Sequence, residues 1–228
     1  MSLENHLNTL IYESAHTANS FVFPQEIPKN PNPLKLCKWY ANEINTVTEQ
    51  LDILEQNHNT LCTCSKGCVS CCHQLIVITY LEHQIIEFSL NNLPLKERTQ
   101  IRETTLKQCK FLTEHGYSQN TFSSPYMPFE EQQKLQEEFF SFKLPCPLLK
   151  QDHTCSIYTV RPTLCWSYRN YGSPTECEQT WNIPTTLKYS DWESRITKRL
   201  YQIKKPSRKY TLKILQFALL EMLSKKQF

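Results

Sequence analysis

Four cysteines fall within nine positions of the sequence, in the stretch CSKGCVSCCH that runs from residue 64 to residue 73. They are Cys64, Cys68, Cys71 and Cys72. The spacing of Cys68 and Cys71 lets one tight turn direct two sulfurs at a single metal ion. Neighbouring residues point their side chains apart, by about 100° in a helix. Cys71 and Cys72 therefore fit better on different metal atoms, or on different corners of a polynuclear centre, so the doublet suggests more than one metal atom.

A second group of cysteines lies between residues 145 and 177, with eight, nine and eleven residues between successive members. Its members are Cys146, Cys155, Cys165 and Cys177. The two groups together supply eight thiols. This number would satisfy two tetrahedral thiolate sites, or a cluster with extra ligands. Thiolates suit zinc, iron–sulfur clusters and copper(I). Paired C-x2-C knuckles would favour structural zinc, and the second group has none, so we favour iron or an iron–sulfur cluster over zinc as the cofactor.

Several neighbours of these cysteines could support a metal site. Gly67 permits close backbone approach, so that amides can hydrogen-bond the thiolates. The cations Lys66, Arg161 and Arg169 could offset the negative charge of a thiolate cluster, although ordinary surface charges explain them equally well. Cys62 and His73 flank the first group and are either additional ligands or bystanders.

The cysteine count also bears on the cellular compartment. The chain has no apolar run near the ~20 residues of a membrane span, and its first twenty residues do not resemble a signal peptide. We therefore expect a cytoplasmic protein without a membrane span, whose thiols stay reduced. Eleven cysteines, an odd number that includes an adjacent pair, argue against a secreted disulfide scaffold. Cys37 and Cys109 fall on the apolar faces of predicted helices and are read as core thiols.

The elements that must position these cysteines are predicted to be mainly helical. Three glycines in 228 residues favour helices over a fold with many tight turns. We expect a mainly α fold around a loop-rich cysteine site, with at most one or two short strands, the best candidate being QLIVIT. Hydrophobic spacing and a Thr79–Glu82 capping box predict helices over about 34–57, 80–90, 95–115, 129–142 and 210–224.

The domain organisation is expected to be simple. Four prolines in the first 33 residues predict an irregular N-terminal lead-in over 1–33. The remainder, 34–228, is expected to form a single domain whose motif core spans 60–180. Within it, residues 145–177 are expected to be loop.

Charge is distributed unevenly along the chain. From Arg195 to Phe228, ten lysines and arginines accompany one acid, Glu221, which gives +9 and leaves −6 for the first 194 residues. Such a basic end could face an acidic protein, a nucleic acid or a membrane surface. A solvated helix face beside a loose loop is the interpretation we favour, and nucleic acid is not the favoured partner.

The cysteine segments resemble a known family. CSKGCVSCCHQLIVIT is similar to the opening motif of the CxxCxxCC zinc- or iron-chelating family, also named YkgJ, and LPCPLLKQDHTCSIYTVRPTLCWSY is similar to its second motif. The similarity covers about residues 60–180. It implies that the metal ligands are the eight cysteines Cys64, Cys68, Cys71, Cys72, Cys146, Cys155, Cys165 and Cys177, and that Tyr158, Arg161 and Pro162 form the signature beside them.

The resemblance also has limits in its detail. Members often have arginine where this chain has Trp166, a contact that Arg169 could replace. A more distant similarity is to the cysteine motif of flagellin lysine N-methylases, which are longer chains. It shows that such a domain can accompany modification of a protein side chain, and no methyl-transfer residue carries over to this sequence.

Two functions fit the sequence. In the first, the centre performs redox or group-transfer chemistry, with Tyr158 as a candidate proton donor and Arg161 as a helper. In the second, zinc only stabilises the loops of a binding module, and the basic C-terminal region faces a protein or small-molecule partner. A catalytic-thiol version with Cys62 as nucleophile is weaker, because no His/Asp partner pattern lies near it.

Overall fold

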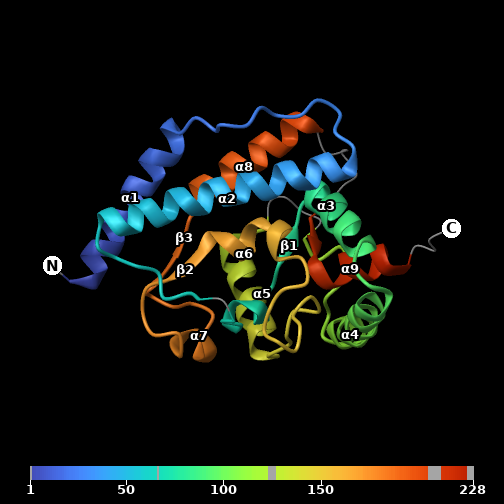
Figure 1. The fold of residues 1–228 in the computed structure, drawn as a ribbon. Coiled ribbons are helices and arrows are strands. Elements are labelled where there is room, and N and C mark those ends of the chain that lie inside the picture. Colours follow the sequence, from blue (N-terminus) through green and yellow to red (C-terminus); the bar gives the residue numbers. More distant parts are fainter. Residues whose placement is uncertain (1, 66, 123–126, 205–211, 225–228) are drawn as a thin grey trace. The chain divides into compact units, whose positions relative to one another are not determined.

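The computed structural model describes residues 2–65, 67–122, 127–204 and 212–224, and it is mainly helical over these ranges (Figure 1). The chain divides into two compact units, each built from two segments that are distant in the sequence. Unit 1 comprises Met1–Cys68 and Thr159–Lys205, and unit 2 comprises Val69–Tyr158 and Pro206–Phe228. The segments of the two units alternate along the chain, and the single domain expected over 34–228 stays a prediction.

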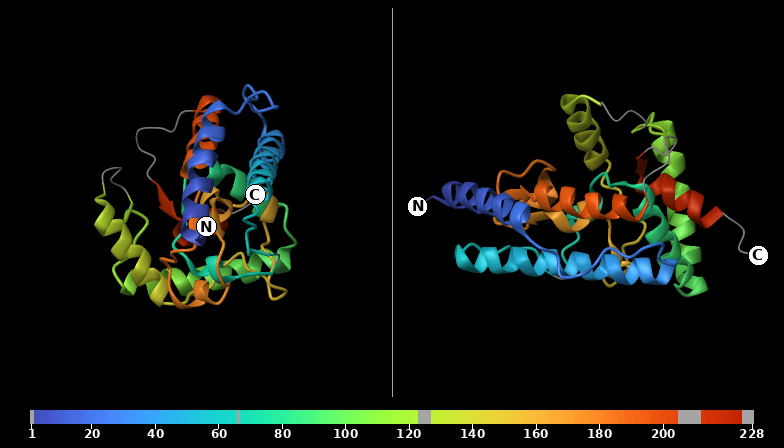
Figure 2. Two further views of the ribbon diagram at one scale, coloured as in Figure 1. Left: turned by 90° about the vertical axis from the view of Figure 1, so that its left-hand side faces the viewer. Right: turned by 90° about the horizontal axis from the view of Figure 1, so that it is seen from above.

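Unit 1 is organised around three long helices. Its helices and strands are α1 (Leu3–Ser20), α2 (Pro33–Asn57), α6 (Thr163–Ser167), β2 (Tyr168–Asn170), α7 (Glu176–Gln179), β3 (Thr186–Lys188) and α8 (Ser190–Ile203). Helix α1 packs against both α2 and α8 (Figure 2), and β2 pairs antiparallel with β3. Trp192 of α8 is fully buried, and its indole N–H donates to Ser14 Oγ of α1 at 3.0 Å.

Helix α1 corrects the expectation of an irregular lead-in. The prediction for 1–33 was wrong over Leu3–Ser20, because all four prolines lie after the helix has ended. Ser2 caps its first turn by accepting the Asn5 amide, and the buried residues recur at spacings of three and four, which gives one inward face. Those residues are Leu7, Leu10, Ser14 and Ala18.

Unit 2 contains the remaining helices. Its elements are the 3₁₀ turn η1 (Ser70–His73), β1 (Val77–Ile78), α3 (Tyr80–Asn91), α4 (Leu95–Glu114), α5 (Phe129–Ser141), β4 (Lys213–Ile214) and α9 (Leu215–Ser224). A further 3₁₀ turn, η2 (Tyr158–Val160), spans the boundary between the two units in the sequence. Helix α9 packs against α3 and α4, and β1 pairs antiparallel with β4, so that Val77 lies opposite Ile214.

Most helices predicted from hydrophobic spacing are confirmed. The helices at 33–57, 80–91, 95–114 and 129–141 start and end within a few residues of the expected bounds, and the Thr79–Glu82 capping box is present. The C-terminal helix starts at Leu215 instead of about 210 because Lys213 and Ile214 form β4; residues 205–211 lie outside the described ranges. Cys37 and Cys109 are buried, as predicted.

Strands and α8 differ from expectation in detail. In the described part of the chain, four strands of two or three residues form two pairs, whereas we expected one or two strands. QLIVIT contributes only Val77 and Ile78 to a strand. Helix α8 was not predicted, although its buried residues Trp192, Ile196 and Leu200 recur every four positions. No helix within the described ranges combines the length and apolar character that a membrane crossing requires.

Candidate functional site

In unit 2, the structure joins the two cysteine segments. Cys71 and Cys72 lie in η1, and the Cys146 amide donates to the Cys72 carbonyl at 2.7 Å. The chain then turns back on itself: Leu149 and Cys155 form a β-bridge, and the Ser156 amide donates to the Leu148 carbonyl at 2.9 Å. This turn returns Cys155 to the neighbourhood of Cys146.

Electrostatics within unit 2 reflect this gathering. Burial, together with the nearby Cys155 and Cys71 thiols, raises the pKa of the Cys146 thiol to about 12. Like groups raise one another's pKa when their ionised forms would lie close together. A cation bound between these sulfurs would remove that repulsion, because thiolates bind metal in the deprotonated form.

In unit 1, the segment Cys62–Thr63–Cys64 lies along the edge of β2. The Thr63 amide donates to the Asn170 carbonyl at 2.8 Å, and the Thr63 hydroxyl donates to the same oxygen at 3.0 Å. In return, the Asn170 amide donates to Cys64 Sγ at 3.4 Å. The first cysteine segment is therefore fixed to the stretch of chain that separates Cys165 from Cys177.

Cys62 and Cys64 interact directly. The Cys62 side chain hydrogen-bonds the Cys64 sulfur, and this bond, followed by the Asn170 amide and the positive charge of Arg169, lowers the pKa of Cys64 to about 6. The same hydrogen bond, together with burial, raises the pKa of Cys62 above its ordinary value. Cys64 is exposed, so the pair presents one stabilised thiolate to solvent, with a protonated thiol beside it.

A buried polar network supports this segment from α2. Glu55 Oε2 accepts the Cys62 amide at 3.2 Å, and Glu55 Oε1 accepts both Arg169 Nη1 at 2.8 Å and the Tyr171 hydroxyl at 2.7 Å. Arg169 Nη1 also contacts Asp52 Oδ1 at 2.6 Å. Arg169 thus lies beside Cys64, which the sequence suggested, but its guanidinium is bonded mainly to carboxylates of α2.

Sequence reasoning did not find Glu55. A usable signal was present, because Glu55 follows Leu51 by four residues and directly succeeds Leu54, which places a carboxyl on the apolar face of the 34–57 helix. Charged side chains on such a face are rarely buried without a partner. A search for the partner would have pointed to Arg169, the cation already noted within the second cysteine segment.

The remaining cysteines of unit 1 lie in short turns and helices. Cys68 closes a turn in which its amide donates to the Ser65 carbonyl at 3.0 Å, and Gly67 has a φ of +94°, which glycine adopts without strain. No atom lies within 4 Å of a Cβ built on Gly67, so its backbone conformation, not close packing, calls for glycine. Cys165 is in α6 and Cys177 is in α7, and both are partly buried.

The signature residues beside the cysteines lie where the chain passes from η2 into α6. Tyr158 is 57% exposed, and its role as a proton donor stays a prediction. The Arg161 carbonyl accepts the Tyr40 hydroxyl at 3.4 Å, and Pro162 occupies the N-cap position of α6. These two residues fix the start of the helix that carries Cys165. His73 ends η1, and Lys66 lies outside the described residues.

No three side chains of His, Cys, Asp or Glu are assembled for metal binding within the described ranges. The eight candidate ligands divide equally between the units: Cys64, Cys68, Cys165 and Cys177 belong to unit 1, whereas Cys71, Cys72, Cys146 and Cys155 belong to unit 2. Their donor atoms are all thiol sulfurs, which suit soft or borderline metals.

Comparison with known proteins gave no identification. No family model, curated protein or solved structure matches this chain. The similarity of its cysteine motifs to the YkgJ family thus stays an expectation from the sequence, and the function has to be argued from the residues themselves.

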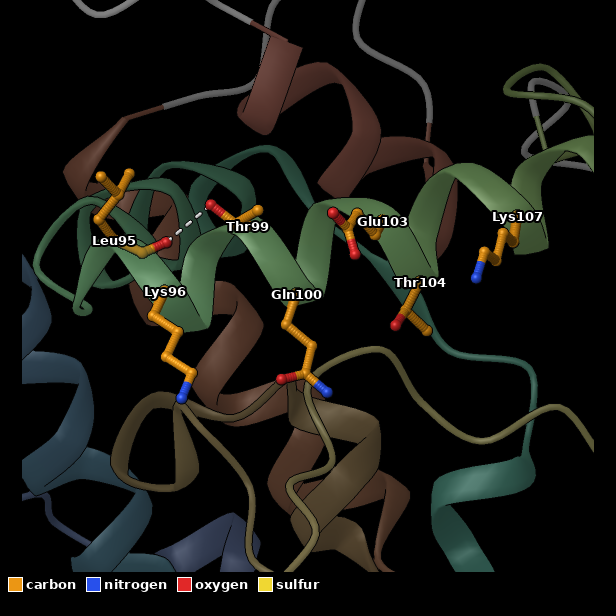
Figure 3. Close-up of a pocket in the computed structure, with 7 residues that line it drawn as sticks. All are labelled: Leu95, Lys96, Thr99, Gln100, Glu103, Thr104 and Lys107. Atoms are coloured by element: carbon orange, nitrogen blue, oxygen red, sulfur yellow. Dashed lines mark hydrogen bonds between the residues drawn. The ribbon is translucent and has the colours of Figure 1, made fainter.

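Two hollows on the described part of unit 2 contain no cysteine. One runs along a single face of α4 and is lined by Leu95, Lys96, Thr99, Gln100, Glu103, Thr104 and Lys107 (Figure 3). Thr99 there donates its hydroxyl to the Leu95 carbonyl at 2.9 Å, within the helix itself. A second hollow involves Phe217 and Leu220 of α9. Neither hollow contains a candidate ligand.

Much of the described basic end is bonded within the fold. Arg195 donates to the carbonyls of Asn19 and Phe21, and Arg199 forms two hydrogen bonds with the fully buried carboxylate of Glu43, at 2.5 and 3.0 Å. Lys213 pairs with Glu221. Arg195 and Arg199 thus link α8 to α1 and α2, and five of the ten basic residues of 195–228 lie outside the described ranges.

Proposed function

We propose that this chain binds a metal centre through cysteine thiolates, with iron, either as bare ions or as an iron–sulfur cluster, favoured over zinc. The observation that carries the proposal is the bond from the Cys146 amide to the Cys72 carbonyl. It joins two cysteine segments that lie more than seventy residues apart, within one compact unit.

The proposed ligands in unit 2 are Cys71, Cys72, Cys146 and Cys155. The thiols of Cys71 and Cys155 both raise the pKa of Cys146, which supports the sharing of a cation by these three residues. Four thiolates satisfy one tetrahedral site or one cluster. Cys71 and Cys72 are adjacent in η1, so we expect them to serve different metal atoms of a polynuclear centre.

The proposed ligands in unit 1 are Cys64, Cys68, Cys165 and Cys177. Support comes from Cys64, whose sulfur accepts the Asn170 amide and whose pKa is lowered to about 6. Amide hydrogen bonds to a ligating thiolate tune a metal site, and a thiolate present at neutral pH needs no further deprotonation to bind metal. The resemblance of both motifs to the YkgJ family points to the same eight residues.

An iron centre supplies electron transfer or activation of a bound group, and we propose a redox or group-transfer role on that basis. The rival role is a zinc-stabilised module that binds through its basic end. The hydrogen bonds of Arg195 and Arg199 weaken that alternative, because these two cations already bind groups within the protein. Ligation by reduced thiols also fits the cytoplasm, which is where we propose that the protein works.

A set of single substitutions tests the ligand assignment. In protein purified without oxygen, Cys71→Ser, Cys146→Ser and Cys155→Ser should each lower the bound metal per chain severalfold. Cys109→Ala is the matched control, because Cys109 is a buried thiol of the same unit that belongs to no cysteine group. Circular dichroism verifies that each variant is folded. If all three serine variants keep the wild-type metal content, unit 2 holds no such site.

A further inference from the structure

Cys62 is not one of the eight proposed ligands, but it is hydrogen-bonded to one of them, Cys64. The Cys62 side chain hydrogen-bonds the Cys64 side chain, and the Cys64 amide donates back to Cys62 Sγ at 3.3 Å. The two thiols are therefore neighbours, with only Thr63 between them in the sequence.

The backbone holds this pair in place. Thr63, between the two cysteines, bonds the Asn170 carbonyl through its amide and its hydroxyl, and the Cys62 amide bonds Glu55 Oε2. The segment is thus fixed on the β2 edge and on α2, while Cys64 itself stays exposed. A fixed and accessible sulfur beside a second thiol is the arrangement that thiol–disulfide exchange requires.

We propose that Cys62 and Cys64 form a dithiol–disulfide pair that exchanges with low-molecular-weight disulfides of the glutathione type. This inference stands apart from the metal proposal, since it concerns a bond between two sulfurs of the metal-free chain. One consequence links the two: a Cys62–Cys64 disulfide would withdraw Cys64 from the thiolates available to a metal.

The exchange proceeds in two steps. The Cys64 thiolate attacks one sulfur of glutathione disulfide, the glutathione S–S bond breaks, and one glutathione thiolate leaves and takes up a proton. Cys62 then loses its proton and attacks Cys64 Sγ, the mixed disulfide breaks, and the second glutathione leaves as a thiol. The two protein thiols are oxidised, and one glutathione disulfide is reduced to two glutathione molecules.

A Cys62–Cys64 disulfide can be detected in a single tryptic peptide. Trypsin cleaves after Lys38 and Lys66, and the peptide 39–66 contains Cys62 and Cys64 and no other cysteine. After chelator treatment and equilibration of the full chain with glutathione disulfide, a Cys62–Cys64 bond lowers the mass of this peptide by two hydrogen atoms. It also protects both sulfurs from iodoacetamide.

Two variants make the test decisive. Cys62→Ser should leave Cys64 as a stable mixed disulfide with glutathione, and Cys109→Ala, the control, should behave as wild type. Glutathione retained on peptide 39–66 of the wild type, to the same extent as in Cys62→Ser, would overturn the proposal. So would a cross-link from this peptide to peptide 67–96, which carries Cys68, Cys71 and Cys72, because Cys64 would then pair elsewhere. A wild-type peptide with both thiols still free would also overturn it.

Discussion

At the scale of single residues, the environment of Cys64 favours the thiolate over the thiol. Its sulfur accepts hydrogen bonds from the Cys62 side chain and from the Asn170 amide, and Arg169 lies close enough to favour the negative form. Each contact stabilises the thiolate relative to the thiol. Cys109, enclosed by apolar atoms in unit 2, shows the opposite behaviour, since burial raises its pKa to about 12.

This contrast predicts a pH dependence of alkylation. In metal-free protein the reaction of Cys64 with iodoacetamide should follow the thiolate fraction, so that it is fast above about pH 6 and is lost as the pH falls through that value. Cys62→Ala removes the largest cause of the shift and should move the midpoint upward, toward the ~8.5 of an unperturbed thiol. Mass spectrometry of peptide 39–66 follows the reaction at each pH. An unchanged pH midpoint of alkylation in Cys62→Ala would show that Cys62 does not stabilise the Cys64 thiolate.

At the scale of elements, α2 and β2 position the Cys62–Cys64 segment through the bonds of Glu55 and Arg169. Glu55 is 3% exposed, and it accepts Arg169, Tyr171 and the Cys62 amide. Asp52 bonds the same Arg169 nitrogen, but its side chain is 57% exposed. The two carboxylates therefore offer a matched comparison of a buried and an exposed partner of one cation.

Glu55→Ala should lower the free energy of unfolding by about 3–5 kcal/mol, because it leaves the Arg169 charge buried without its main partner. Asp52→Ala should lower it by less than about 1 kcal/mol, since an exposed ion pair contributes little. Urea denaturation followed by circular dichroism measures both, with equal m-values as the check that the unfolding transition is unchanged. Equal losses of stability in the two variants would contradict a distinct role for the buried carboxylate.

Local signals explain which elements the sequence could predict. The long apolar stripe of α2 and the Thr79–Glu82 capping box depend on residues close in the chain, so spacing alone located these helices. The prolines at 24–33 do not argue against helix α1, because a proline breaks a helix only locally and all four follow Ser20. The strands β1 and β4 stabilise each other across more than 130 residues, and no local pattern specifies such a pairing.

The candidate site shows the same division. Residue type and spacing predict the cysteines as candidate ligands, whereas the roles of Glu55 and Asn170 depend on contacts between distant segments. Asn170 contacts the Cys62–Cys64 segment mainly through its backbone amide and carbonyl, which the sequence does not distinguish from those of any other residue.

At the scale of the whole molecule, the chain distributes its candidate ligands between two interleaved units. The boundaries fall between Cys68 and Val69 and between Tyr158 and Thr159, so each unit receives two cysteines from the first group and two from the second. A ligand set that spans two distant segments ties them together when metal binds, and the binding free energy then adds to folding stability. On the proposed assignment, metal binding would stabilise segments that contain only short helices, turns and loops.

Metal and acid-labile sulfide content of protein purified without oxygen, together with its visible absorption spectrum, tests the central claim most directly. The account predicts iron bound in proportion to the chain. Accompanying sulfide and a brown chromophore would indicate a cluster, and iron without sulfide would indicate thiolate-bound iron atoms. Stoichiometric colourless zinc would keep the cysteine site but overturn the preference for iron. A folded chain with reduced thiols that binds neither metal would contradict the account.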